Sequence, residues 1–414
     1  MFSPYKVTLA LCLGAFCAVT TAASEQPLVT YRDFLAAPHS YKTREPKDKF
    51  TSALPTLESD PRLDRSSEKA FLRSLLRILD IPESSQLLVF STTSLQLRFI
   101  SPTNPRALYF NEDIYIGYIP GGRVEVIGID PDLGAIFYIF DIPQNGGPLH
   151  FERSDRCMNC HAGEDSGHVP GLVVKSVIPG VSGGSLDAFR VGKSGHDIPL
   201  SERFGGWHVT GDRLTNHWGN AIGKFVGGEI QRVANPAGAN FDLAKYLVPT
   251  SDILAHLVHE HQVGFVNRAV EATYRARTAA FLSGGKLSVE QEAELDATAA
   301  EFTKYLLFAD EVPLPSGGIK ADPAYAKAFQ ATGKNGDALR ELDLETRLFK
   351  LRCSYMIYSA AFQGLPPTVK GRVFARLRGA LVGDAREFAY LGQAEKREIY
   401  RIVKATVKEL PPEW

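Results

Sequence analysis

The chain has no excess of charge of either sign. It contains 46 Lys and Arg against 47 Asp and Glu among 414 residues, which gives a net charge of −1. A protein that binds nucleic acid usually carries a basic excess, so this balance argues against such a partner. The sequence has no acidic run of the kind that forms a disordered tail. We also find no internal repeat and no low-complexity segment.

The sequence also has few long apolar runs. Residues 1–23 combine a positive charge, an apolar run over residues 7–19 and small residues before a predicted cleavage point, which is the pattern of a secretory signal peptide. The run is shorter than the about 20 residues that cross a bilayer. We therefore expect export to the periplasm and no membrane span in the mature chain.

Cysteine is scarce once this segment is set aside. Cys12 and Cys17 fall inside it, which leaves Cys157, Cys160 and Cys353 in the mature chain. Three cysteines are too few for a disulfide scaffold. Cys353 lies in an apolar stretch, and we predict that it is a buried thiol that behaves as a small hydrophobic side chain.

The periodicity of the mature chain predicts an α+β fold. Residues 24–65 are polar and contain proline, so we expect an extended lead-in. Residues 66–245 should form an α+β region, in which one helix over residues 66–79 precedes an antiparallel sheet and a loop-rich centre. Residues 246–414 have helical spacing and should pack on that region as one globular unit.

The individual elements follow from local patterns. A Pro-Gly-Gly sequence at residues 120–122, between two strand-like runs, predicts a hairpin. Strands are predicted at residues 88–90, 95–100, 107–110, 114–119, 123–129, 134–140, 171–178 and 206–210. Helices are predicted at residues 251–283, 288–308, 338–361, 366–382 and 393–408.

One motif carries chemistry. Cys157, Cys160 and His161 form the sequence C-x-x-C-H, which is the attachment signature of c-type haem. Two thiols three positions apart on one turn can reach the two vinyl groups of one porphyrin, and the following histidine then lies beneath the iron. We predict one covalent haem c, an iron porphyrin, with His161 as the proximal iron ligand. A zinc site and a redox dithiol are the alternatives, but the chain has no second cysteine pair and no thioredoxin-like context.

The sixth position of the iron is open to several side chains. Met158 lies inside the attachment loop, and Met356 lies in an apolar stretch and is predicted to be core. A histidine or an open site is therefore favoured. His261 shares a helical face with apolar residues and should point inward, and His196 lies in the loop-rich centre. Each is a candidate for the distal ligand or the haem pocket.

Other side chains have weaker signals. His256 and His259 are expected to point outward from the same helix, by its periodicity. His217 is a further candidate in the loop-rich centre. Basic residues near the motif could pair with haem propionates: Arg153, Arg156 and Lys175.

The sequence resembles a family of long exported bacterial proteins that contain a cytochrome c domain with a single C-x-x-C-H motif and have no established reaction. The resemblance implies haem binding and a redox role, and it carries over Cys157, Cys160 and His161 only. It also places His196 and His261 in segments typical of the family. The segments that carry it are residues 100–113, 118–122, 157–161, 205–211, 251–262 and 353–359.

These observations lead to two main hypotheses. The first is a periplasmic monohaem c-type cytochrome-like protein that transfers electrons to or from a redox partner. The second is a haem-dependent oxidoreductase, peroxidase- or oxygenase-like, that acts on a small-molecule substrate at an open iron site. The long flanks of the motif favour a substrate pocket or a docking surface, because a minimal carrier needs only about 100 residues. A haem-based sensor is the third alternative, although no signalling segment is visible.

Overall fold

A computed structural model describes residues 29–143, 147–190, 192, 194–211, 218–236, 238–331 and 337–414. The predicted signal peptide at residues 1–23 and the candidate His217 lie outside these ranges. Within them, no helix is both long and apolar enough to cross a membrane.

The fold is α+β, as predicted, and a seven-stranded antiparallel sheet forms its N-terminal half. The strands follow the order β6-β5-β4-β3-β2-β1-β9, and neighbours in the chain pair directly through most of the sheet. Their bounds are β1 Leu87–Val89, β2 Arg106–Phe110, β3 Ile114–Tyr118, β4 Val124–Asp130, β5 Gly134–Phe140, β6 Glu152–Arg153 and β9 Trp207–His208. Two small hairpins stand apart from it, β7 Val177–Pro179 with β8 Ser185–Ala188, and β10 Ala221–Val226 with β11 Glu229–Ala234.

The predicted hairpin at residues 120–122 is confirmed as the turn between β3 and β4. Gly121 has a φ of +78°, which a residue with a side chain rarely adopts, and the N–H of Gly122 donates to the carbonyl of Ile119 at 2.8 Å. The glycines therefore allow the chain to reverse within this short turn.

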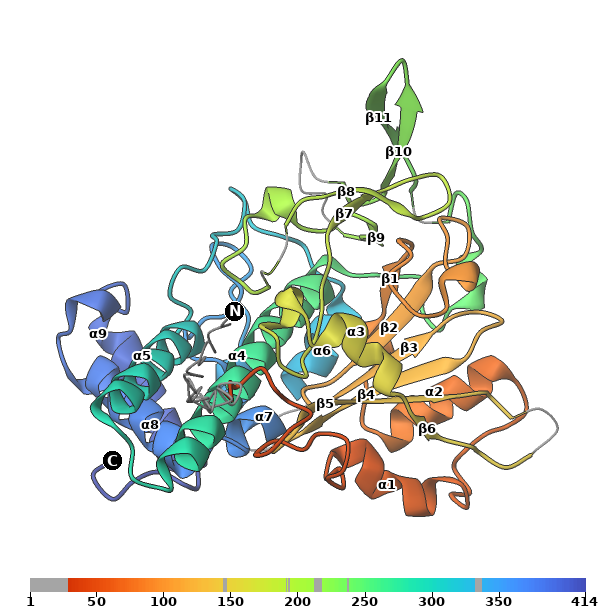
Figure 1. The fold of residues 1–414 in the computed structure, drawn as a ribbon. Helices are drawn as coiled ribbons and strands as arrows, with labels where there is room; N and C mark the ends of the chain where they lie inside the picture. The colour runs from red at the N-terminus through yellow and green to blue at the C-terminus, as the bar shows by residue number, and fades with distance from the viewer. Residues whose placement is uncertain are drawn as a thin grey trace, which may run out of the picture.

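Helices form the C-terminal half and also cover the sheet. Figure 1 shows α5, α8 and α9 gathered on the side of α4 away from the sheet. The bounds are α1 Lys49–Leu57, α2 Glu68–Ile78, α3 Met158–His161, α4 Ile253–Ser283, α5 Val289–Leu306, α6 Pro323–Ala331, α7 Ala360–Gln363, α8 Pro367–Val382 and α9 Gln393–Thr406. Caps explain several starts: the side chain of Ser67 accepts from the N–H of Ala70 at α2, and Ser288 forms a capping box at α5. A single hydrophobic cluster contains buried residues of both the sheet and these helices.

The two faces of the sheet are covered differently. On one face, α1 and α2 pack tightly, with Phe50 against Tyr138 and Phe71 against Phe140. On the other face, α4 contacts β3, where the hydroxyl of Tyr115 donates to Gln262 at 3.1 Å. Side chains that lie opposite one another on adjacent strands point to the same face. The register of the strands therefore identifies which residues look toward α4.

Four sequence predictions about secondary structure are wrong. Of residues 171–178, predicted as a strand, only Val177 and Ile178 belong to one, β7. Residues 95–100 do not form a strand; residues Leu97–Phe99 are a 3-10 turn, because β1 pairs directly with β2 and leaves no place between them. Most of residues 338–361 is irregular, since the Asp343 side chain accepts from the N–H groups of Glu345 and Thr346 and ends any helix there. The lead-in at residues 24–65 contains α1, which Asp48 caps.

Candidate haem-attachment site

The C-x-x-C-H motif occupies a single short turn beside β5. A 3-10 turn over Asp155–Cys157 runs directly into α3, and the N–H of Ser154 donates to the carbonyl of Phe137 at 2.9 Å. This bond ties the start of the motif to the sheet. Cys157 is half-buried and Cys160 is exposed, and both thiols are free. Burial raises the pKa of the Cys157 thiol. The turn thus presents two unpaired thiols, one at the surface and one facing the protein.

The imidazole of His161 is fixed by one backbone bond. Its Nδ1 lies 2.9 Å from the carbonyl oxygen of Gly171, and its ring packs 4.6 Å from the ring of Phe137. A carbonyl accepts only from a protonated nitrogen, so Nδ1 carries the hydrogen and Nε2 carries the lone pair. Burial lowers the pKa of His161 to about 4, which keeps the ring neutral at pH 7.

The loop that holds His161 is itself held by α4. The Asn267 side chain accepts from the N–H of Leu172 at 2.8 Å and donates to its carbonyl at 2.9 Å. The Nε2 atom of His161 has no hydrogen-bond partner among the residues that the structure describes, and it retains accessible surface. Histidines that bind metals commonly donate their other ring N–H to a carbonyl in this way. His161 therefore has the tautomer and the free nitrogen that an iron ligand needs.

The sheet beneath the motif is partly open. Strands β2 to β5 lie wholly within the described residues, and their partly exposed members are Arg106, Leu108, Glu125, Ile127 and Ile139. We call these five residues the sheet platform. All of them point to the face that carries Phe137 and Tyr115, because Leu108, Gly117, Glu125 and Ile139 lie opposite one another and Ile127 lies between Tyr115 and Phe137. The other face of the same strands is fully buried.

An ion pair crosses this platform. The Arg106 guanidinium donates to Glu125 at 2.9 Å, and both side chains are largely buried. Glu125 also accepts from the amide of Gln96 at 2.9 Å. Despite its burial, the pKa of Glu125 is lowered by Arg106 and by these hydrogen bonds, so the pair is ionised at pH 7. Burial is the main cause of the lowered pKa of His161, and the positive charge of Arg106 adds to it.

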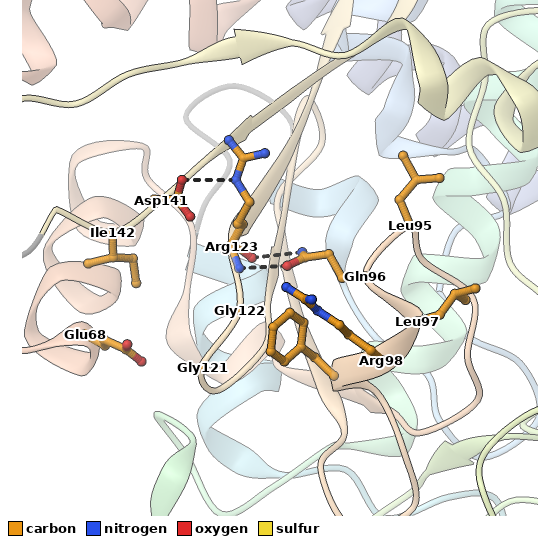
Figure 2. A pocket seen from close by; sticks show the side chains of 11 residues that line it. Glu68, Leu95, Gln96, Leu97, Arg98, Gly121, Gly122, Arg123, Asp141 and Ile142 are labelled. Atoms are coloured by element: carbon orange, nitrogen blue, oxygen red, sulfur yellow. Dashed lines mark hydrogen bonds and ion pairs between the residues drawn. The ribbon is translucent and has the colours of Figure 1, made fainter.

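A hollow of about 690 Å³ adjoins the platform at the β3–β4 turn. Figure 2 shows Arg123 bound to Asp141 on one wall and Gln96 bound to the backbone of Arg123. Leu95 and Leu97 line the opposite wall and are 46% and 57% exposed. A hollow with an apolar wall and a polar wall, joined to the platform through Gln96, extends the space that a flat apolar ligand could fill.

The two histidines that the sequence offered as distal candidates contact each other. The Nδ1 atoms of His196 and His261 lie 2.8 Å apart, and Nε2 of His261 lies 2.7 Å from the hydroxyl oxygen of Ser354. Both rings stack on Tyr305 of α5. Burial lowers the pKa of both, for His261 to about 3. The pair thus lies on the α5 side of α4, and both ring nitrogens of His261 are occupied.

The expectation that His256 and His259 point outward is wrong. Each is only 6% exposed, because α4 is covered by the sheet on one side and by helices on the other. Nε2 of His256 lies 3.0 Å from the carbonyl of His208 and 3.1 Å from the Ser251 hydroxyl. His259 instead packs 5.1 Å from the ring of Phe110 and 5.7 Å from that of Tyr115.

The structure also places the remaining residues that the sequence singled out. Cys353 and Met356 are fully buried, as expected, and burial raises the pKa of the Cys353 thiol to about 12. Arg153 donates to the carbonyls of Tyr41 and Arg44 and so has a structural partner. Lys175 pairs with Asp165 at 2.8 Å. Arg156 is exposed.

Comparisons of the chain with protein-family models, with curated proteins and with solved structures found no match. The function is therefore inferred from the site itself. Its features are two free thiols on one turn, an imidazole with a free Nε2, and a partly open apolar floor.

Proposed function

We propose that this chain is an exported monohaem c-type protein of the periplasm that binds one haem through Cys157, Cys160 and His161 and takes part in electron transfer. The observation that carries the proposal is the hydrogen bond between Nδ1 of His161 and the Gly171 carbonyl. It leaves Nε2 as the unprotonated nitrogen, on a turn whose two cysteines are unpaired. A histidine kept only for packing has no need of a free nitrogen with accessible surface.

The residues present fit the group. Cys157 and Cys160 would form the two thioether bonds, and His161 would bind the iron from the side of α3. Leu108, Ile127 and Ile139 of the platform would contact the porphyrin, whose burial would remove their exposed apolar surface from water. Bound haem would supply an iron that changes between Fe(II) and Fe(III).

The chain's own residues would set the electrostatics of that iron. The Gly171 carbonyl makes His161 a more basic ligand by accepting its Nδ1 hydrogen. The platform contributes the Arg106–Glu125 pair, which is neutral as a whole. Burial of the imidazole and of this pair limits the access of water, and burial and hydrogen bonding are the main means by which a protein tunes such a potential.

A second candidate is a haem-dependent oxidoreductase with an open distal site. The observation in its favour is the position of the usual sixth ligands. Met356 is buried in the C-terminal core, Met158 belongs to α3 itself, and both ring nitrogens of His261 are hydrogen-bonded. This arrangement favours an iron that can accept a small ligand.

One experiment separates the two candidates. The protein is produced with its signal segment in a bacterium that attaches c-type haem, and its visible spectrum is recorded before and after carbon monoxide is added to the reduced form. Electron transfer alone predicts a low-spin spectrum that carbon monoxide leaves unchanged. The oxidoreductase predicts a high-spin spectrum that shifts with the gas. Absence of any covalently bound haem would contradict both.

A further inference from the structure

We infer that His259 is the distal residue of the haem pocket, the side chain that faces the sixth position of the iron from the side opposite His161. The inference rests on the proposed function and adds to it the residue that controls what binds to the iron. The proposed roles of Cys157, Cys160 and His161 are unchanged.

His259 differs from the other buried histidines in its hydrogen bonding. Six histidines are buried in the described chain: His39, His196, His208, His256, His259 and His261. All of these except His259 have at least one ring nitrogen within hydrogen-bond distance of a partner. Neither nitrogen of His259 has such a partner among the described residues, and neither is sealed from solvent. Both ring nitrogens of this largely buried side chain are therefore free to interact with a ligand that reaches them.

His161 and His259 contact residues that lie on one face of the sheet. Phe137, which packs on His161, lies opposite Ile127, and Ile127 lies opposite Tyr115, which packs on His259. Residues opposite one another on adjacent strands share a face. His161 and His259 are therefore on the same face of the sheet, and the platform residue Ile127 lies between their contact points.

The contact points of His161 and His259 on the sheet are close to each other. Phe137 and Tyr115 are two strands apart, and strands lie about 4.8 Å from their neighbours, so the two contact points are roughly 10 Å apart. Burial, and to a smaller extent the charge of Arg106 on the platform, lowers the pKa of both histidines. The two imidazoles therefore contact the same face of the sheet at points roughly 10 Å apart, with the platform residue Ile127 between those points.

His261 and His196, the distal candidates from the sequence, lie on the other side of α4 from the platform face. His261 follows His259 by two residues, which turns its side chain by about 200° around α4. It contacts Tyr305 of α5 and Ser354, whereas His259 contacts β2 and β3. His261 and its partner His196 therefore support the far side of α4, and His259 alone of these three contacts the strands of the platform face.

The test uses the full chain with haem attached and compares His259→Ala with His261→Ala. The oxidised and reduced visible spectra and the affinity for cyanide are measured for both variants. Direct ligation by His259 predicts conversion of a low-spin spectrum to high-spin in His259→Ala, with recovery on addition of free imidazole. A hydrogen bond from His259 to a bound ligand predicts a loss of cyanide affinity of roughly tenfold or more. His261→Ala is expected to keep the wild-type spectrum and affinity.

Two results would overturn the assignment of His259. A His259→Ala protein with wild-type spectrum and wild-type cyanide affinity would overturn the inference, and so would a spectral change in His261→Ala alone. His259→Gln, which preserves volume and polarity, replaces the alanine variant if that variant does not fold. Loss of covalent haem from the wild-type chain would instead reject the proposed function, so the two failures are distinguishable.

Discussion

The Nδ1 atom of His161 lies 2.9 Å from the carbonyl oxygen of Gly171, ten residues further along the chain. This bond fixes the ring and its tautomer, and Asn267 of α4 fixes the loop that provides the carbonyl. The turn that carries the C-x-x-C-H motif is thereby connected to α4, the longest helix among the residues that the structure describes. The same helix carries His259 toward the sheet.

Replacement of Asn267 tests this connection. Asn267→Ala leaves the N–H and carbonyl of Leu172 without their partners in a buried loop. We expect a loss of about 1–3 kcal/mol in the free energy of unfolding. We also expect a changed reduction potential in haem-loaded protein, because the orientation of His161 depends on this loop. Urea unfolding and a redox titration measure the two effects. An unchanged potential in a destabilised variant would separate Asn267 from the ligand.

The buried ion pair next to His259 predicts a non-additive double mutant. Arg190 and Glu260 have side chains only 2% and 5% exposed, with an N–O distance of 2.8 Å. Arg190→Met alone leaves the Glu260 carboxylate buried without its cation and should cost about 3–5 kcal/mol. Arg190→Met combined with Glu260→Leu should cost less than the sum of the single variants. Chemical unfolding of the four proteins gives the coupling energy, and simple additivity would show that the pair does not interact.

The sheet platform predicts a cost that depends on haem. Leu108 is partly buried on the platform face and packs against the core, so Leu108→Gln in a chain without haem should lower stability by about 1 kcal/mol. In haem-loaded protein the same substitution should lower the melting temperature by more, because a polar side chain would contact the porphyrin. The Cys157→Ala/Cys160→Ala background serves as the haem-free control. Equal effects in both backgrounds would show that nothing covers the platform.

His39 predicts an acid sensitivity that is independent of the proposed haem site. Its ring is fully buried, its Nε2 lies 3.0 Å from the Thr278 hydroxyl, and burial lowers its pKa from 6.5 to about 4. The unfolded chain therefore takes up the proton first as the pH falls. Its contribution to stability is complete above pH 6.5 and is lost progressively between pH 6.5 and 4.

A matched variant isolates this effect. Between pH 7.5 and 4.5 the wild type should lose about 2.5 kcal/mol more than His39→Gln, which cannot titrate. Urea unfolding at the two pH values measures the difference. Equal losses in the two proteins would show that His39 titrates normally in the folded state.

Local sequence signals predicted much of the sheet and most helices. Strand-like runs and the Pro-Gly-Gly turn located β3, β4 and the hairpin between them, and the predicted helix over residues 66–79 is α2. Residues 95–100 have the composition of a strand, but the direct pairing of β1 with β2 excludes them from the sheet. Such competition for a place in a sheet is a long-range effect, and composition does not contain it.

The motif was predicted from the sequence, and the pocket around it was not. Periodicity indicated that His261 points inward, and it does, but toward α5. Periodicity predicted that His259 faces outward. The prediction failed because α4 is covered by the sheet on one side and by helices on the other, which a single apolar stripe does not reveal. The available signal was the pair of charged residues in otherwise apolar strands, Arg106 and Glu125, on the face that His259 contacts.

The central claim is covalent attachment of haem at Cys157 and Cys160, and the most direct measurement is haem content after denaturation. Full-length protein expressed with haem-attachment machinery is unfolded, freed of loose haem by acid and organic solvent, and weighed by mass spectrometry. We predict one haem retained by the wild type and by Cys353→Ala, and none by Cys157→Ala/Cys160→Ala. A wild-type chain whose mass equals that of the polypeptide alone would contradict the account.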